Sequence, residues 1–185
     1  MLVIFRKAFF LFTLLGLFVA CSHEETYPSI HEALEQVEYK TIFHKEKVTD
    51  NCILVFLEPV FEEGGRSIGY INFTRQDEGW EMGSLKATNY GYFQDFIFGR
   101  TTITCEKEED YYYGLTFESG AKQLIIKEIT IDDEKSETKV VPLIEYGDIF
   151  RPKFWIFNRD FDYNYEMYLE HENGEMEFIT RGIIK

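Results

Sequence analysis

The segment Gly65-Arg66-Ser67-Ile68-Gly69 has the G-x-S-x-G spacing of the nucleophile elbow found in serine hydrolases. That chemistry requires a strand, a sharp turn and a helix, because the turn exposes the serine oxygen and the turn and helix start supply oxyanion donors. Here Ser67 instead opens the run 68–74, which has the composition of another strand. We therefore expect Ser67 to be an ordinary exposed hydroxyl, and we assign no catalytic residue.

A second candidate chemistry is metal binding at Asp160, Asp162 and Asn164, whose spacing opens an EF-hand calcium loop. The loop also requires Gly at its sixth position and Glu at its twelfth, where this chain has Tyr165 and His171. No two histidines have the spacing of a pair of metal ligands; the four are His23, His31, His44 and His171. The sequence predicts no metal site and no cofactor, and the three oxygen-bearing residues are expected on one solvated strand face, with calcium as the alternative.

The N-terminal segment has the three parts of a secretory signal: two basic residues, an apolar run over residues 8–17, and Ala20 before Cys21. The apolar segment is shorter than the roughly 20 residues of a spanning helix. A small residue directly before a cysteine at this point resembles the lipobox of bacterial lipoproteins, although Phe18 stands where that family prefers leucine. The resemblance implies cleavage before Cys21 and a diacylglyceryl group on its sulfur. The alternative is a secretory signal in which Cys21 is incidental.

The charge of the chain limits its partners. It has 19 basic and 33 acidic residues, a net charge of −14. Removal of residues 1–20, which hold two basic and no acidic residues, would leave −16. Such a chain is repelled by nucleic-acid phosphates and by anionic lipid headgroups. We expect no nucleic-acid partner, and we expect contact with the membrane only through a lipid anchor at Cys21.

Two further cysteines, Cys52 and Cys105, lie next to strand-like runs at 52–57 and 101–104. An extracytoplasmic location permits a disulfide between them. The surrounding pattern nevertheless favours two buried thiols that pack as small hydrophobic side chains. Pairing requires the fold to bring their Cα atoms within about 7 Å.

The hydrophobic pattern predicts a mainly β fold, α+β at its N-terminal end, with one short helix and about eleven antiparallel strands in a sandwich or roll. Ser29 and Glu32 have the spacing of a capping box, and the helix is expected to end near Glu38. The strands are expected over residues 40–48, 52–57, 67–75, 80–87, 100–106, 111–117, 123–131, 138–144, 151–158, 164–170 and 176–184. Asn173-Gly174 predicts a hairpin with a type I′ turn.

The chain divides into four expected regions. These are a lipoprotein signal peptide at 1–20, a polar tether at 21–28, a helix with an antiparallel sheet at 29–98, and an all-β sandwich-like half at 99–185. The last two could form one continuous domain, because the pattern near residues 88–98 has no clean period.

Aromatic residues make up 17% of the chain. In a strand, the run Tyr111-Tyr112-Tyr113 would place two rings on one face and one on the other. Aromatic side chains fit the half-buried surface of a sheet, so we expect most of them in the core. Exposed aromatic platforms beside carboxylates, which would suit the sugar rings of a cell wall, are the alternative. A glycosidase pair cannot be selected among 33 acidic residues without geometry.

The order of these elements resembles small uncharacterised lipoproteins and secreted proteins of Gram-positive spore-forming bacteria. The residues that carry the resemblance are 41–48, the run from Cys52, Ser67-Ile68-Gly69-Tyr70, Gly79-Trp80, Lys127-Glu128-Ile129 and 154–158. The resemblance implies export and carries no catalytic residue.

We therefore expect a lipid-anchored module on the extracytoplasmic face of the cell membrane. Its expected role is non-enzymatic, binding or structural, with a protein or a cell-wall component as its partner. The alternative is a hydrolase that acts on cell-wall material. A concave pocket with convergent carboxylates would favour the hydrolase, and a smooth sandwich with an exposed aromatic patch would favour binding.

Overall fold

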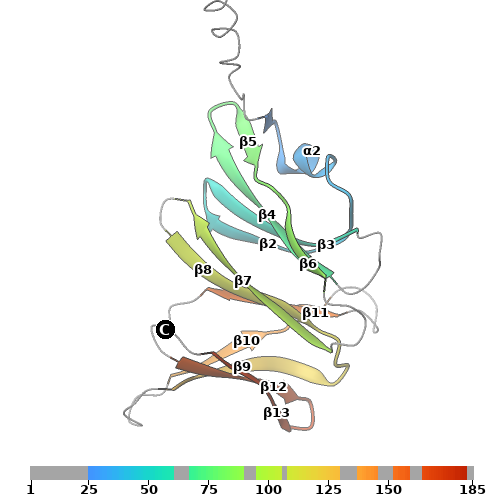
Figure 1. Cartoon of the computed structure of the whole chain (residues 1–185), viewed down its shortest axis with the longest axis vertical. Coiled ribbons are helices and arrows are strands. Elements are labelled where there is room, and N and C mark those ends of the chain that lie inside the picture. Colours follow the sequence, from blue (N-terminus) through green and yellow to red (C-terminus); the bar gives the residue numbers. More distant parts are fainter. Residues whose placement is uncertain are drawn as a thin grey trace, which may run out of the picture.

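The computed structural model describes residues 25–60, 67–89, 95–105, 108–129, 137–145, 152–158 and 164–182. These residues form thirteen strands and one short helix. The strands make three antiparallel sheets that are stacked in layers (Figure 1). The predicted mainly β, sandwich-like fold with one short helix is confirmed.

The first layer is the N-terminal sheet, with strand order β1-β5-β4-β3-β2 and β6 also paired to β4. Its strands are β1 (Thr26–Tyr27), β2 (Tyr39–Thr49), β3 (Cys52–Pro59), β4 (Ser67–Gln76), β5 (Gly79–Met82) and β6 (Lys86–Asn89). The strand expected over 80–87 is divided into β5 and β6, which pair with successive parts of β4. The division lies at residues 83–85, where the Gly83 N–H still donates to the carbonyl oxygen of Asn72 at 2.9 Å.

The helix α2 (Ile30–Leu34) covers the side of the N-terminal sheet that faces away from the middle sheet. Its cap is the predicted one, because the Ser29 side chain accepts a hydrogen bond from the N–H of Glu32 at 3.2 Å. The helix is shorter than expected, because the chain tightens into a turn in which the Val37 N–H donates to the Leu34 carbonyl oxygen. Val37 still packs into the same apolar cluster as the buried Leu34.

The second layer is the middle sheet, with strand order β11-β8-β7. Its strands are β7 (Phe96–Thr104), β8 (Glu108–Thr116) and β11 (Lys153–Asn158). Tyr111 and Tyr113 belong to the core shared with the N-terminal sheet, and Tyr112 belongs to the core on the other side. The predicted division of the three tyrosine rings is therefore confirmed. A side chain at Gly114 would overlap the Trp155 ring, so glycine allows this sheet to be packed on both faces.

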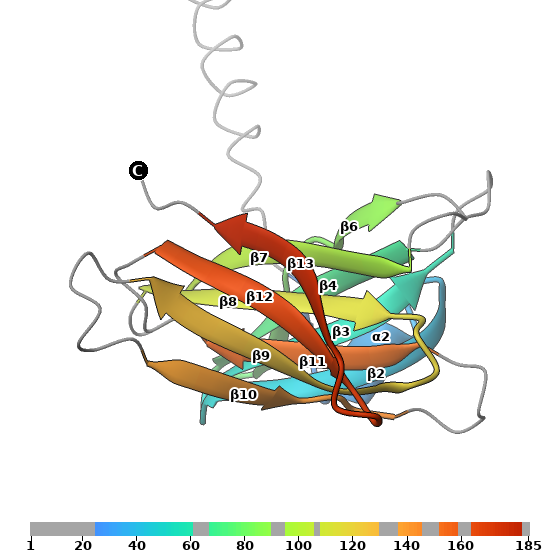
Figure 2. The ribbon, with the colours of Figure 1, turned by 90° about the horizontal axis from the view of Figure 1, so that it is seen from below.

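The third layer is the C-terminal sheet, with strand order β10-β9-β12-β13. Its strands are β9 (Ala121–Ile129), β10 (Thr138–Pro142), β12 (Asn164–His171) and β13 (Met176–Gly182). One face packs Leu124, Ile126 and Met167 against Trp155 of the middle sheet. The other face has no layer over it among the described residues (Figure 2).

The predicted hairpin at Asn173-Gly174 joins β12 to β13, but its turn is not of type I′. Type I′ requires positive φ at both central residues, and among the described residues only Gly79 and Gly174 have positive φ. The N–H of Gly174 donates to the carbonyl oxygen of His171 at 2.9 Å. The connection is a three-residue loop that ends in a left-handed glycine.

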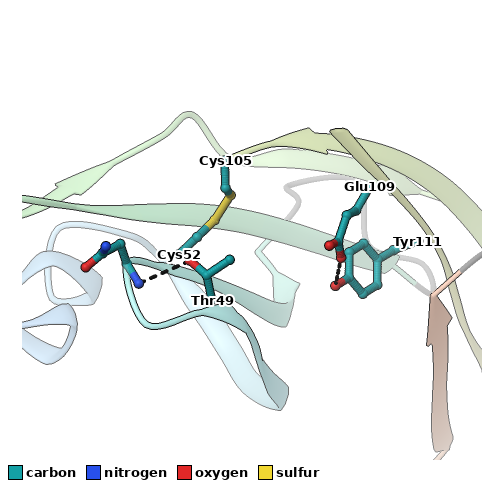
Figure 3. The surroundings of a disulfide bond; sticks show 6 residues. Thr49, Cys52, Cys105, Glu109 and Tyr111 are labelled. Atoms are coloured by element: carbon teal, nitrogen blue, oxygen red, sulfur yellow. Dashed lines mark hydrogen bonds between the residues drawn. A yellow bond between two sulfur atoms is a disulfide. The ribbon is translucent and has the colours of Figure 1, made fainter. Parts of the chain in front are cut away.

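A disulfide joins Cys52, the first residue of β3, to Cys105, which directly follows β7 (Figure 3). Their Cα atoms are 6.2 Å apart, within the range of a disulfide. The prediction of two unpaired thiols, which the sequence pattern favoured, is therefore wrong. Both cysteines lie at the same end of the contact between the N-terminal and middle sheets. The hydrophobic pattern of a single strand cannot predict this proximity, because it depends on how the two sheets pack.

The connection between β6 and β7 spans the boundary that the sequence placed near residues 88–98, and residues 90–94 of it lie outside the described part. An apolar core that includes Phe56, Tyr113 and Phe154 joins the sheets on either side of this connection. No helix in the described segments has the length and apolar character needed to span a membrane.

Candidate binding surface

Three of the residues singled out in the sequence, Cys21, Asp160 and Asp162, lie outside the described residues. Asn164 is the first residue of β12, where it pairs with Ile129 of β9. Within the described segments, no three His, Cys, Asp or Glu side chains are grouped so that they could hold a metal ion. The described residues do not test the calcium interpretation, because Asp160 and Asp162 lie outside them.

Ser67 lies on a strand, as predicted, but its side chain is not exposed. It opens β4 and is 2% exposed, and its hydroxyl donates to the carbonyl oxygen of Pro59 at 3.3 Å. The expectation of an exposed hydroxyl was wrong because β4 is an interior strand, so its first residue is enclosed between β3 and β6. A buried hydroxyl bonded to the backbone is placed to stabilise the strand, not to attack a substrate.

We expect no labelling of the purified protein by a fluorophosphonate probe, which reacts with activated serines. We also expect Ser67→Ala to lower the free energy of unfolding by about 1 kcal/mol, because one buried hydrogen bond is lost. Chemical denaturation measures this change. Stoichiometric labelling that disappears in Ser67→Ala would show that the hydroxyl is a nucleophile.

A surface hollow of about 390 Å³ lies beside the β12–β13 hairpin. Its lining residues are Gly120, His171, Glu172, Asn173, Glu175 and Glu177. Glu172 and Glu175 are exposed, and the half-exposed Glu177 side chain contacts His171 Nε2 at 3.2 Å. A catalytic carboxylic acid needs a desolvated setting, which these exposed side chains lack, and the lining contains no Ser, Thr or Cys. The hollow is not the convergent pocket that a hydrolase would need.

The outward-facing side of the C-terminal sheet has a different character, and we call it the outer face. Side chains alternate along each strand, so on β9 the buried Leu124 and Ile126 point to the core while Gln123, Ile125 and Lys127 point outward. Strand pairing then fixes which residues of the other strands share this face.

An apolar row crosses all four strands of the outer face. Val140 pairs with Ile125, Ile125 pairs with Tyr168, and Tyr168 pairs with Phe178. Val140 is 52% exposed and Phe178 is 54% exposed, while Ile125 is buried between its neighbours. The rings of Tyr168 and Phe178 meet edge to face with centroids 5.6 Å apart. Met176, 40% exposed, lies one outward position from Phe178 and widens the row.

Polar residues border the apolar row on both sides. On one side the Tyr168 hydroxyl donates to Glu166 at 2.6 Å, and Arg181 also donates to Glu166. The Lys127 ammonium lies 4.8 Å from the centre of the Tyr168 ring.

On the other side, Glu170 accepts hydrogen bonds from Gln123 at 2.7 Å and from Lys122 at 3.0 Å. These partners keep the two carboxylates in place beside the row.

Among the described residues of the outer face, the charges nearly cancel. Three cations, Lys122, Lys127 and Arg181, accompany two carboxylates, Glu166 and Glu170. This group has a formal charge of +1, in contrast to −14 for the whole chain. The outer face is therefore much less acidic than the rest of the protein.

These contacts shift the ionisation of the two carboxylates. The Tyr168 hydroxyl and then the Arg181 guanidinium lower the pKa of Glu166, because both donate to its charged form. The Gln123 amide and then Lys122 lower the pKa of Glu170 in the same way. A lowered pKa means that these contacts stabilise the fold above the ordinary value of 4.5, and that this stabilisation is lost as the pH falls through the lowered pKa.

We expect Arg181→Ala to raise the pKa of Glu166 and to leave the pKa of Glu170 in place, since different partners shift Glu170. Carboxyl-carbon NMR titration measures both pKa values in one sample, which makes Glu170 the internal control. A Glu166 pKa at or above 4.5 in the unaltered protein would contradict the described contacts.

The outer face lies at the opposite end of the molecule from the first described residues. α2 and β5, which pairs with β1, are at one end of the longest axis, and the C-terminal sheet is at the other (Figure 1). The middle sheet lies between them (Figure 1).

The outer face was not predicted from the sequence. One sequence signal for this face was present. Tyr168 lies between Glu166 and Glu170 in the alternating positions of the strand that are otherwise polar. Val140 and Phe178 could not be joined to it, because their alignment depends on the pairing of strands far apart in the sequence.

Comparisons with protein-family models, with curated proteins and with solved structures gave no match. The interpretation of the outer face therefore depends on its own geometry.

Proposed function

We propose that the protein is anchored by lipid at Cys21 on the extracytoplasmic face of the cell membrane, and that its outer face binds a component of the cell envelope. In this proposal the protein is a binding module and not an enzyme. The observation that supports it is the apolar row of Val140, Ile125, Tyr168 and Phe178 on a sheet face that no described layer covers.

An exposed sheet face normally carries polar side chains, with its apolar residues turned to the core. Here the polar pattern is interrupted at the same position on all four strands, so the apolar side chains join into one row. Contiguous exposed apolar groups with a polar border are typical of interaction sites. An exposed aromatic pair within such a border is a typical anchor for a partner.

The position of the outer face agrees with anchoring at Cys21. Thr26, the first residue of β1, lies five positions after Cys21, so an anchor would hold the N-terminal sheet within about 18 Å of the lipid. The C-terminal sheet lies at the other end of the stack (Figure 1). The outer face would then point away from the membrane, toward the material outside the cell.

The cell-wall hydrolase is not proposed further, because no observation among the described residues favours it. The carboxylates of the hollow are exposed, and Ser67 is buried against the backbone.

The proposal is tested by separating the lipid anchor from the outer face. A mature chain with Cys21→Ala lacks the acyl chains but contains every described residue, and it should still sediment with washed cell envelopes. Phe178→Ser should weaken this sedimentation about tenfold, as expected for loss of an aromatic anchor.

The matched control is Phe98→Ser, because Phe98 is a 39% exposed phenylalanine on β7, outside the outer face. It should change the sedimentation less than twofold. Equal sedimentation of the Phe178→Ser and unaltered chains would overturn the proposal.

A further inference from the structure

Building on the proposed function, we infer that the partner of the outer face is a glycan strand of the cell wall: a polymer of pyranose rings that carries carboxylates, as in peptidoglycan. The inference depends on three features of the outer face: its aromatic pair, its polar borders and its local charge.

The aromatic pair provides a stacking site for sugar rings. A pyranose ring has an apolar face of C–H groups, which packs against an aromatic ring much as another apolar side chain would. Phe178 is more than half exposed, and the Tyr168 ring beside it is held by Glu166 and Lys127. A ring with fixed contacts loses little conformational entropy when a ligand binds.

The polar borders match the edges of a sugar. Hydroxyl groups project from the rim of a pyranose ring and both donate and accept hydrogen bonds. A strand laid along the apolar row would place these hydroxyls beside Glu166 and Arg181 on one side, and beside Gln123 and Glu170 on the other. The row crosses three strand spacings, about 14 Å, so it offers contact to a short oligosaccharide and not to a single ring.

The local charge favours an anionic polymer at this face. A polymer of carboxylates is repelled by a chain with a net charge of −14. The outer face carries Lys122, Lys127 and Arg181 against two carboxylates. The repulsion is therefore smallest where these cations lie beside the aromatic pair.

A second copy of the chain fits the outer face less well. Four strands and three rows of outward side chains give an area of about 400 Å², so two copies would bury roughly 800 Å² in total. A stable interface requires about 1,200 Å² or more. Two copies with this net charge would also repel each other.

The test uses the lipidated full-length protein in nanodiscs of neutral lipid. The probe is a set of soluble glycan strands from purified peptidoglycan, labelled at one end, and binding is followed by fluorescence anisotropy. We expect saturable binding that weakens about tenfold in Phe178→Ala and less than twofold in the control Phe98→Ala. Lys127→Glu should also weaken binding and should reduce its dependence on salt, because an attractive charge becomes repulsive.

The outcomes separate this inference from the proposed function. If the glycan strands do not bind, or bind equally to the Phe178→Ala variant, the glycan inference is wrong. If Phe178→Ser nevertheless abolishes sedimentation with envelopes, the outer face binds another partner, such as a protein, and the proposed function stands. If neither assay responds to the change at Phe178, both proposals are overturned.

Discussion

In the mature chain, Cys21→Ala should release the protein from carbonate-washed membranes, an all-or-none change. Each buried methylene of an acyl chain contributes about 0.8 kcal/mol, and two or more chains give stable attachment. No other attachment of the mature chain to lipid is expected, because the acidic chain is repelled by anionic headgroups. Membrane fractionation after a carbonate wash, together with intact-mass analysis, measures the effect.

The matched control for this change is Cys105→Ala, which removes a different cysteine. That variant should keep its acyl chains and stay in the membrane fraction. An unmodified N-terminus on the unaltered mature protein would show that the lipobox resemblance is misleading. Membrane attachment of Cys21→Ala after the wash would show that another segment holds the protein.

The second large effect is expected from loss of the disulfide. Changing Cys52→Ala and Cys105→Ala together should lower the free energy of unfolding by about 4 kcal/mol, because the bond closes a loop with a sequence separation of 53 residues. The bond also joins the N-terminal sheet to the middle sheet. The N-terminal sheet is the one nearest the proposed anchor. Urea denaturation of the oxidised protein and the double variant measures the difference.

Each single variant should lose nearly the whole stabilisation, since either change opens the loop. A free-thiol assay of the unfolded, unreduced protein provides the control: Cys52 and Cys105 should contribute no free thiol. Two reactive thiols from this pair would contradict the bond in the structure.

Local pattern in the sequence was enough to predict most elements of the fold. Strands such as β3 and β12 have their own apolar runs or alternation, and Ser29 caps α2 as its spacing indicated. The predictions of the turn type and of one strand were wrong where contacts with neighbouring elements determine the backbone conformation. The type I′ turn failed because Gly174 alone has positive φ in that loop, and the strand expected over 80–87 is interrupted at Gly83.

Features that depend on register or on the stacking of sheets could not be predicted. Cys52 and Cys105 meet only because two sheets pack together, and Ser67 is buried only because β3 and β6 flank its strand. The outer face has the same origin, since Val140 and Phe178 are brought to Tyr168 by strand pairing.

Hydroxyl-radical footprinting in intact cells would show whether a partner covers the outer face at the cell envelope. The lipidated full-length protein is oxidised in cells and again after purification, and the oxidation rate of each side chain is compared. We expect several-fold slower oxidation of Phe178 and Met176 in cells, with an unchanged rate for Phe98. Equal oxidation rates for Phe178 in the two samples would show that nothing covers the outer face and would overturn the proposal that it binds an envelope component.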